Sequence, residues 1–586
     1  MSMQPGGMLP GLEPQGPDTK RLLITVTLVT LMWAAFQMFS PQVPPGPAAD
    51  PAAPAATPTA TATPVAVAPA ELSATAGTSN VLPEETRKFS ADVGGTMSGA
   101  GVGVKGGYVA ELSSHGAQVS SFQLDGYADV LRKDATSGVV PPVDLASRGE
   151  TGAAALALRS RDGTVTLAAN APYEIVEGGE RNIVFSRLTP AGVRVTRRYE
   201  FDPARFAFTH KIELKNESST AQTAAFDLVL TGVERPGERD QGGMFNPTPD
   251  ALAGVCMVGG SRETFNSREV EEEPEKFDGT ITYAGIDRHY FLAAVVLEGA
   301  STDRCTAKPF TINPKEAGGE VVHGFEIVLG LKELSLAPGE VKSLDVAAYF
   351  GPKQVGLLQE FGHELAENIN FGIFGVLSRP MLWVMVQLYK YLGNFGVAII
   401  LLTVLMKLLT FPLTQKSYVS MQQIKKVKPE LDELTKKYAH DRTLLGQKQM
   451  ELYKTKGINP LAGCFPVLVQ MPIWFALYRT LSQAVELYQQ PFADAPWTLG
   501  ILDLTQPDML LWGVSLLPLI VGALMLVQTF MQPPPDDQPQ MKYMMWGMPV
   551  VFTFLMLSMA SGLSIYMITN SLLTMAQQYY IKKKYA

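Results

Sequence analysis

The chain has 586 residues, more than one hydrophobic core usually organises, and a formal net charge of −8. The charge is divided unevenly. Residues 41–370 carry 28 basic and 43 acidic side chains, whereas residues 371–586 carry 18 and 11. An acidic, water-soluble portion is therefore joined to a basic, apolar one. Three cysteines, Cys256, Cys305 and Cys464, are too few for a disulfide framework or a four-cysteine zinc site.

The first apolar segment lies at the N-terminus. Leu22–Phe39 is uncharged and follows Lys20 and Arg21. Its length is near the lower limit for a membrane span, and basic flanks stay in the cytoplasm. We expect an uncleaved transmembrane anchor after a cytoplasmic segment, 1–21; a cleaved signal peptide is the alternative. Residues 41–84 are rich in Pro, Ala and Thr and predict a flexible linker.

Residues 85–351 show a period of two. In Arg205–Lys215, apolar or aromatic side chains alternate with polar ones, and Val193–Phe201 and Val321–Leu331 are similar. Many short strands separated by turn signals predict a large antiparallel β-sandwich. The acidic run Glu269–Asp278 is expected to be a solvated loop. In an oxidising compartment Cys256 and Cys305 can form one disulfide, but two unpaired buried thiols remain equally open.

After residue 351 the period becomes helical. Residues 352–392 predict amphipathic helices, and Phe371–Leu392 suits a helix lying on the membrane surface because Arg379 and Lys390 interrupt it. Residues 393–586 then predict a core of five transmembrane helices. The expected spans are Phe395–Leu413, Leu461–Leu481, Met509–Met531, Tyr543–Met559 and Leu563–Ile581.

The distribution of charge gives the orientation. Gln415–Pro460 carries 10 basic and 5 acidic side chains, whereas Val485–Asp508 carries four acidic and no basic ones. The positive-inside rule then puts both termini in the cytoplasm and the β-domain in the periplasm.

Lys407 is the most informative residue of the core. It lies inside the second span, about 10 Å from the cytoplasmic end at 1.5 Å per residue. A cation at such a depth costs about 2.5–3.5 kcal/mol on insertion scales. Thr403 lies one turn away on the same side, which predicts a polar stripe facing a wet interior. A lysine that reaches the membrane surface along its own side chain is the alternative.

Other spans offer polar groups as well. Gln470 lies between Pro466 and Pro472 in the third span, and the sixth span carries Tyr566, Asn570 and further polar residues. Each alone could make an ordinary interhelical hydrogen bond. Together they predict a hydrophilic recess with one positive charge inside the membrane.

The cytoplasmic segment Ser420–Gly457 predicts a helical hairpin. Apolar residues from Ile424 to Tyr438 follow helical spacing, and Asp441 is a suitable N-cap for the second arm. The surface is basic, and the lysines expected to make contacts are Lys425, Lys426, Lys428, Lys436 and Lys437. Such a surface suits anionic lipid headgroups or ribosomes, although a solvated positive-inside loop would look the same.

We find no motif of enzyme chemistry. The six histidines have no metal-ligand spacing, and a P-loop, a G-x-S-x-G elbow and an H-E-x-x-H motif are absent from the sequence. We therefore expect no catalytic site, no metal, no cofactor and no specific nucleic-acid ligand.

The helical portion closely resembles a known family. The stretch Asn459–Pro466, continuing through Gln470–Ile473 and Ala476–Tyr478, is similar to the signature of the YidC membrane-protein insertases. Gly393-Asn394, Phe411–Thr414 and Ser561–Leu563 extend the likeness along residues 371–580. The N-terminal anchor and the large outer domain are typical of the Gram-negative form.

The resemblance implies several properties. It implies an inner-membrane protein that inserts and folds nascent membrane proteins through a groove open to the cytoplasm and to lipid. It also implies a periplasmic β-supersandwich, and work with the Sec translocon, the ribosome, the targeting machinery and membrane lipids. The groove's basic residue, usually arginine in Gram-negative members, is Lys407 here, which loses bidentate hydrogen bonding. Met567, after Tyr566, stands where the family often has a second tyrosine.

Two other classes of function stay open. A small-solute transporter or channel would use the polar recess for flux, but the five spans show no internal repeat. A membrane-anchored periplasmic carbohydrate-binding or carbohydrate-active module would place its function in residues 85–351.

Overall fold

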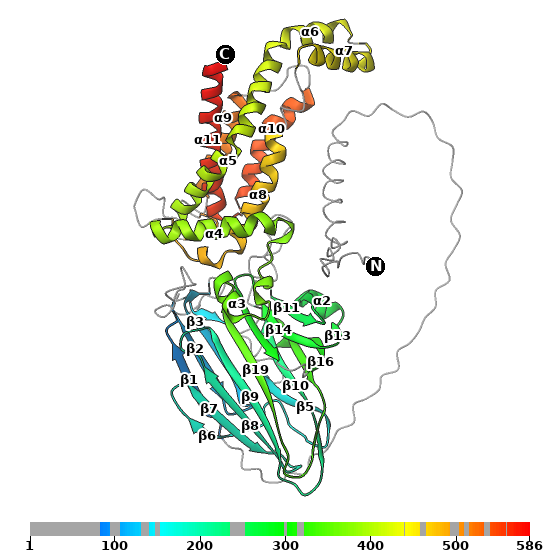
Figure 1. The fold of residues 1–586 in the computed structure, drawn as a ribbon, viewed down its shortest axis with the longest axis vertical. Helices are drawn as coiled ribbons and strands as arrows, with labels where there is room; N and C mark the ends of the chain where they lie inside the picture. Colours follow the sequence, from blue (N-terminus) through cyan, green and yellow to red (C-terminus); the bar gives the residue numbers. More distant parts are fainter. Residues whose placement is uncertain are drawn as a thin grey trace, which may run out of the picture. The chain divides into compact units, whose positions relative to one another are not determined.

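A computed structural model describes residues 83–93, 106–129, 140–146, 153–234, 252–297, 302–312, 321–438, 440–457, 465–492, 503–508, 515–531, 539–557 and 559–585 (Figure 1). The expected anchor, nearly all of the linker, Cys464 and the motif Asn459–Cys464 lie outside these residues.

The β-domain contains three antiparallel sheets. The nine-stranded sheet has the order β12 (Ser261–Asn266), β11 (Ala253–Val258), β14 (Ile281–Asp287), β15 (Phe291–Leu297), β19 (Val341–Pro352), β9 (Ala207–Asn216), β8 (Val193–Phe201), β7 (Asn182–Leu188) and β6 (Glu174–Gly178). The six-stranded sheet has the order β13 (Lys276–Asp278), β16 (Thr302–Ile312), β17 (Val322–Leu331), β10 (Gln222–Val233) and β18 (Leu334–Leu336), and β5 (Ala157–Gly163) pairs with β10. The four-stranded sheet runs β1 (Thr86–Ala91), β2 (Tyr108–Ser113), β3 (Gln118–Ala128) and β4 (Pro142–Asp144).

Both smaller sheets pack against the nine-stranded one. The rings of Phe122 on β3 and Phe350 on β19 are 5.3 Å apart, and those of Phe325 on β17 and Phe265 on β12 are 5.6 Å apart. The alternation seen in the sequence produces this packing: Phe206 precedes β9, and Phe208, Ile212 and Leu214 follow on the strand, all at most 3% exposed. The predicted β-sandwich is therefore confirmed.

A disulfide also joins the nine-stranded sheet to the six-stranded sheet. The structure pairs Cys256 on β11 with Cys305 on β16, with the Cα atoms 6.5 Å apart. Both residues are fully buried. The bond therefore connects the nine-stranded sheet to the six-stranded sheet inside the core.

The acidic run is a correction to the sequence analysis. The run Glu269–Asp278 is largely exposed as expected, but the prediction of a loop was wrong, because helix α2 covers Ser267–Glu272 and strand β13 follows it. The Asn266 side chain accepts a hydrogen bond from the Glu269 amide, and the Glu269 carboxylate accepts one from the Asn266 amide. This capping box overrides the repulsion between neighbouring acidic residues.

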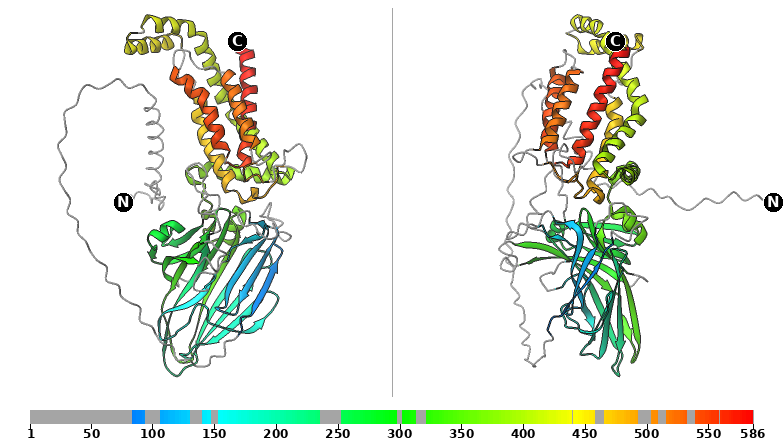
Figure 2. Two further views of the ribbon diagram at one scale, coloured as in Figure 1. Left: turned by 180° about the vertical axis from the view of Figure 1, so that it is seen from behind. Right: turned by 90° about the vertical axis from the view of Figure 1, so that its left-hand side faces the viewer.

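The second half of the chain is helical. It contains α3 (Val355–Phe361), η3 (Leu365–Asn368), η4 (Gly372–Phe374), α4 (Gly375–Leu392), α5 (Phe395–Lys426), α6 (Lys428–Lys437), α7 (Arg442–Thr455), α8 (Phe465–Gln483), η6 (Val485–Leu487), α9 (Leu516–Met531), α10 (Pro539–Met556) and α11 (Ser561–Tyr585). Helices α5 and α11 pack side by side, and α4 runs crosswise to both (Figures 1 and 2).

Among the described residues, Gly372–Leu392 and Phe395–Gln415 are long and apolar enough to cross a membrane. Leu516–Met531 and Met545–Met556 are shorter apolar helices. Helices occupy all five ranges in which the sequence predicts spans. A helical core with apolar helices is therefore confirmed, and the number of crossings remains a prediction.

The helical hairpin differs from its prediction at one point. The first arm is not one continuous helix, because α5 ends at Lys426 and α6 begins at Lys428. Pro429 explains this break: it has no amide hydrogen, and its ring clashes with a carbonyl of the preceding turn. Asp441 caps α7 as expected, accepting a hydrogen bond from the Leu444 amide at 2.9 Å. Gly457 follows the helix with φ +67°, a left-handed conformation that glycine adopts easily.

Candidate functional site

Helix α5 has two unlike sides around Lys407. Leu405, Leu408 and Leu409 are 41%, 64% and 65% exposed. Such large apolar side chains suit contact with acyl chains rather than water. Lys407 is half-buried and its side chain reaches α11. The cation is therefore directed into the helix packing.

Lys407 is held by two polar side chains of α11. Its ammonium donates a hydrogen bond to the Thr574 hydroxyl at 2.7 Å and a longer one to the Asn570 amide oxygen at 3.4 Å. No ion pair links it to a carboxylate within the described residues. An ammonium has three donors, and only two neutral acceptors meet it within the described residues. This arrangement leaves the charge available to an incoming anionic group.

A second pair of polar residues joins α8 to α11. The Gln470 side-chain amide donates to the Tyr566 hydroxyl at 2.8 Å. Tyr566 is 2% exposed, whereas Gln470 is half-buried. Pro472, two residues after Gln470, lies inside α8. The predicted convergence of polar groups from the second, third and sixth spans is thus present as two hydrogen-bonded clusters that share α11.

A third contact continues the polar side toward the C-terminus of α11. The Gln577 amide donates to the Thr414 hydroxyl on α5 at 2.9 Å, and both residues are buried. The sequence places Thr414 on the polar side of its span and Thr574 and Gln577 among the polar residues of the sixth span, but the predicted groove set included none of the three. Asn570, Thr574 and Gln577 are spaced by four and three residues and so lie on one face of α11. That spacing was the signal that could have selected them.

Two predicted groove residues are placed differently from the expectation. Thr403 is 2% exposed, and its hydroxyl donates back to the Ile399 carbonyl of its own helix. Residues four apart on a helix are offset by about 40°, enough to turn Thr403 into the packing while Lys407 faces α11. Met567 is half-buried and packs against the hydrophobic core. Neither residue joins the polar clusters.

The hairpin formed by α6 and α7 is fixed by an ion pair between its arms. Lys456 lies 2.7 Å from Glu430. Lys426, Lys436 and Lys437 are exposed and Lys428 is half-buried, while the side chain of Lys425 lies outside the description. The Lys437 ammonium stands 5.5 Å from the centre of the Tyr438 ring. The hairpin thus presents a basic surface on a short two-helix element.

The described residues contain no cluster of three or more His, Cys, Asp or Glu side chains that could hold a metal ion. The polar groups that meet along α11 in the contacts described above are hydroxyls, amides and one ammonium. They can solvate a polar or anionic segment, but they include no nucleophile beside a general base.

Comparison with known proteins divides the chain into the same two parts, a β-domain and a helical portion. Residues 105–384 match the family described as YidC periplasmic domain, and residues 387–586 match the family described as 60Kd inner membrane protein. A membrane protein insertase YidC of Anaeromyxobacter dehalogenans (strain 2CP-C) is 33% identical and aligns with 97% of this chain and 98% of its own length. That of Geobacter metallireducens is 31% identical, with 97% and 99% covered.

Comparison with solved structures gives low similarity scores. An active YidC insertase crystal structure covers 81% of this chain and 90% of its own, with 16% identity and a TM-score of 0.35. A galactose mutarotase-like protein from Lactobacillus casei covers 42% and 97%, with a TM-score of 0.28. Both scores are below 0.5, so the assignment depends on the sequence relatives.

Together with these matches, the β-domain and the helical core define an inner-membrane protein with a periplasmic domain. The chain belongs to the YidC family of membrane protein insertases. Its activity is accordingly the insertion of nascent membrane proteins.

Proposed function

We propose that the polar clusters on α11 form the wall of a groove that carries the polar tail of a client into the membrane. The observation that carries this proposal is the environment of Lys407. A half-buried ammonium meets a hydroxyl and an amide oxygen, and no carboxylate neutralises it within the described residues. Such a charge replaces part of the hydration that an acidic tail loses on leaving water.

In this mechanism the tail enters from the cytoplasm and passes Lys407, Thr574 and Asn570. Gln470 and Tyr566 offer further hydrogen bonds along the same helix. The apolar segment of the client then moves sideways into lipid past the exposed leucines of α5. Burial of apolar surface supplies the driving force, about 25 cal/mol per Å². No covalent bond changes and no nucleotide is consumed.

The remaining elements have supporting roles in the proposal. Leu22–Phe39 anchors the chain, five further helices span the membrane, and both termini face the cytoplasm. Helix α4 lies on the periplasmic membrane surface, which its crosswise direction relative to α5 and α11 supports (Figure 2). The basic hairpin receives the ribosome, the targeting machinery or anionic lipid, and the Sec translocon is a further partner.

Site-specific photocrosslinking tests the groove. A crosslinking amino acid is placed at Gln470, Asn570 or Thr574, and the protein is exposed to a ribosome-bound client that is stalled during insertion. We expect crosslinks to the client from all three positions. The matched control is Ile473, which is buried on the same helix as Gln470. Crosslinks from the control but none from the three polar positions would contradict the groove.

The hairpin is tested separately. Deletion of residues 428–457, with a short Gly-Ser linker in their place, should abolish insertion while the helical core remains folded. A charge-reversal set, Lys436→Glu with Lys437→Glu, should reduce insertion without removing the fold. Normal insertion by both variants would reject this role.

A further inference from the structure

A second polar site lies on the outer face of the six-stranded sheet, in the β-domain. Asp227 on β10 pairs with Arg159 on β5 and with Gly330 on β17, and Gly330 pairs with Arg304 on β16. Directly paired residues on neighbouring strands point to the same face of a sheet. The intervening residues, such as Phe226 and Leu228, point to the opposite face and belong to the hydrophobic core. The row of charges therefore occupies the face turned away from the core.

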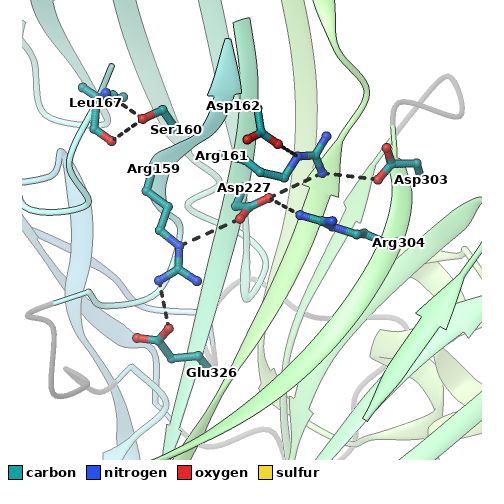
Figure 3. A network of polar contacts seen from close by, with 9 residues as sticks. All are labelled: Arg159, Ser160, Arg161, Asp162, Leu167, Asp227, Asp303, Arg304 and Glu326. Carbon is teal, nitrogen blue, oxygen red and sulfur yellow. Dashed lines mark hydrogen bonds and ion pairs between the residues drawn. The ribbon is translucent and has the colours of Figure 1, made fainter. Parts of the chain in front are cut away.

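Three guanidinium groups surround one carboxylate in this row (Figure 3). Nitrogen atoms of Arg304, Arg161 and Arg159 lie 3.6, 3.7 and 3.9 Å from the Asp227 carboxylate. The Asp227 side chain is only 10% exposed. These distances are longer than normal hydrogen bonds. The Asp227 carboxylate therefore offsets part of the positive charge but does not accept hydrogen bonds from the three guanidinium groups. Two buried atoms here, Nη1 of Arg161 and Oδ1 of Asp227, lack a hydrogen-bond partner among the described groups.

The row borders a cavity of about 490 Å³. Its lining residues are Arg159, Arg161, Asp227, Arg304, Lys308, Pro309, Phe310 and Glu326. Gly330 leaves room for this cluster, because a Cβ at this position would lie 2.6 Å from Nη1 of Arg161, 2.6 Å from Cγ of Arg304 and 2.7 Å from Oδ1 of Asp303. The cavity has the size of sites that hold small molecules.

The charges of the lining favour an anion. Four cations face two carboxylates, Asp227 and Glu326, and Glu326 is engaged by Arg159 at 3.1 Å. Two further carboxylates, Asp303 and Asp162, contact Arg161, but they are 46% and 82% exposed and so are screened by water. Each guanidinium has five donors in a planar fork that matches phosphate or carboxylate oxygens.

We propose that this cavity binds the phosphate group of a small phosphate ester. The oxygens of the phosphate accept from Arg161, Arg304 and Lys308, and the buried Asp227 oxygen accepts from a hydroxyl or amine of the same ligand. A phosphate is favoured over a carboxylate because its oxygens are tetrahedrally arranged and can engage three separate cations. The ester can be a soluble metabolite or the headgroup of a phospholipid, since both present the same chemistry.

Isothermal titration of the full-length protein in detergent tests the proposal. The probes are glycerol 3-phosphate, a soluble ester, and glycerophosphoglycerol, the deacylated headgroup of phosphatidylglycerol, with glycerol as the uncharged control. Saturable binding of either phosphate probe, and none of glycerol, is the expected result. Tighter binding of the first indicates a soluble ligand, and tighter binding of the second indicates a lipid. Binding of neither probe overturns the proposal.

Three variants show whether the binding uses this cavity. Arg304→Gln should weaken binding about tenfold or more, since one charge-assisted contact is lost. Lys308→Gln removes an exposed cation with little risk to folding and should also weaken it. Gly330→Ala keeps every charge but forces the Arg161 guanidinium and the side-chain stem of Arg304 to shift, and we expect a similar loss. Gly178→Ala is the matched control, because a Cβ there meets nothing within 4 Å. Unchanged affinity in Gly330→Ala together with weakening in Arg304→Gln would indicate diffuse attraction and reject a built site.

Discussion

The β-domain and the helical core each contain a cation within their packing, but the two cations differ in burial and in the number of hydrogen bonds that they donate. Arg197 on β8 is fully buried and donates to the Tyr199 hydroxyl at 2.8 Å, to His210 Nε2 at 3.1 Å, and to the carbonyls of Gly116 and Leu156. Lys407 is half-buried and donates to two side chains. Arg197 is enclosed by acceptors that belong to the β-domain itself, whereas one N–H donor of the Lys407 ammonium has no acceptor among the described residues. We infer that Arg197 stabilises the β-domain and that Lys407 serves the client.

Removal of Arg197 should give the largest loss of stability. We expect Arg197→Leu to destabilise the β-domain by about 3–5 kcal/mol, because four acceptors lose their partner inside the core. Pulse proteolysis of the β-domain measures this loss. All six tryptophans lie outside residues 85–351, so tryptophan fluorescence reports separately on the helical part and should not change.

The neighbouring arginine supplies the control for this prediction. Arg198 points to the other face of β8, has a 47% exposed side chain and contacts Glu177 at 3.4 Å. Arg198→Leu should change stability by less than about 1 kcal/mol. Equal effects of the two substitutions would contradict the view that Arg197 is a structural cation.

The disulfide should rank second. Cys256 and Cys305 are 49 residues apart, and closing such a loop stabilises by about 2–4 kcal/mol. The double variant Cys256→Ala, Cys305→Ala should lose this amount in the β-domain alone, measured by the same proteolysis experiment. A shift in tryptophan fluorescence would show instead that the two regions unfold as one unit.

The third prediction concerns a buried acid in the loop after α8. Burial raises the pKa of Glu486 to about 7. Between its unfolded value near 4.5 and this value, the folded protein keeps a proton that the unfolded chain releases, so stability falls as the pH rises from about 4.5 to about 7 and levels off above that. Glu486→Gln should therefore stabilise at pH 8 by up to about 3 kcal/mol and have no effect at pH 4.

Thermal unfolding of the full-length protein in detergent, followed by tryptophan fluorescence, measures this difference. Glu433→Gln, an exposed change on α6, should shift neither value. The β-domain responds in the opposite sense, because burial and then Arg197 hold the pKa of His210 well below its usual range. Its stability should decline as the pH falls below 6.5, where the unfolded histidine becomes protonated. The same pH dependence of stability in both regions would contradict the opposite effects expected from Glu486 and His210.

The sequence predicted the features that depend on local periodicity. The alternation through Phe208, Ile212 and Leu214 placed the buried face of β9, and Asp441 marked the start of α7. It missed α2, although Asn266 and Glu269 carried the capping-box spacing. The sequence could not predict features that depend on packing between elements far apart in the chain. Examples are the pairing of β5 with β10 that gathers Arg159 and Asp227, and the 40° offset that separates Thr403 from Lys407.

The most direct measurement compares the insertion of clients that differ only in the charge of the translocated tail. Cells or proteoliposomes contain the wild type, Lys407→Arg, or Lys407→Gln as the only insertase. We predict that Lys407→Gln reduces insertion of a client with two acidic tail residues about tenfold, since a charge-assisted contact is lost, and changes a neutral tail much less. Lys407→Arg should retain the preference for acidic tails. Equal insertion of acidic and neutral tails by the wild type and by Lys407→Gln would contradict the proposed role of Lys407.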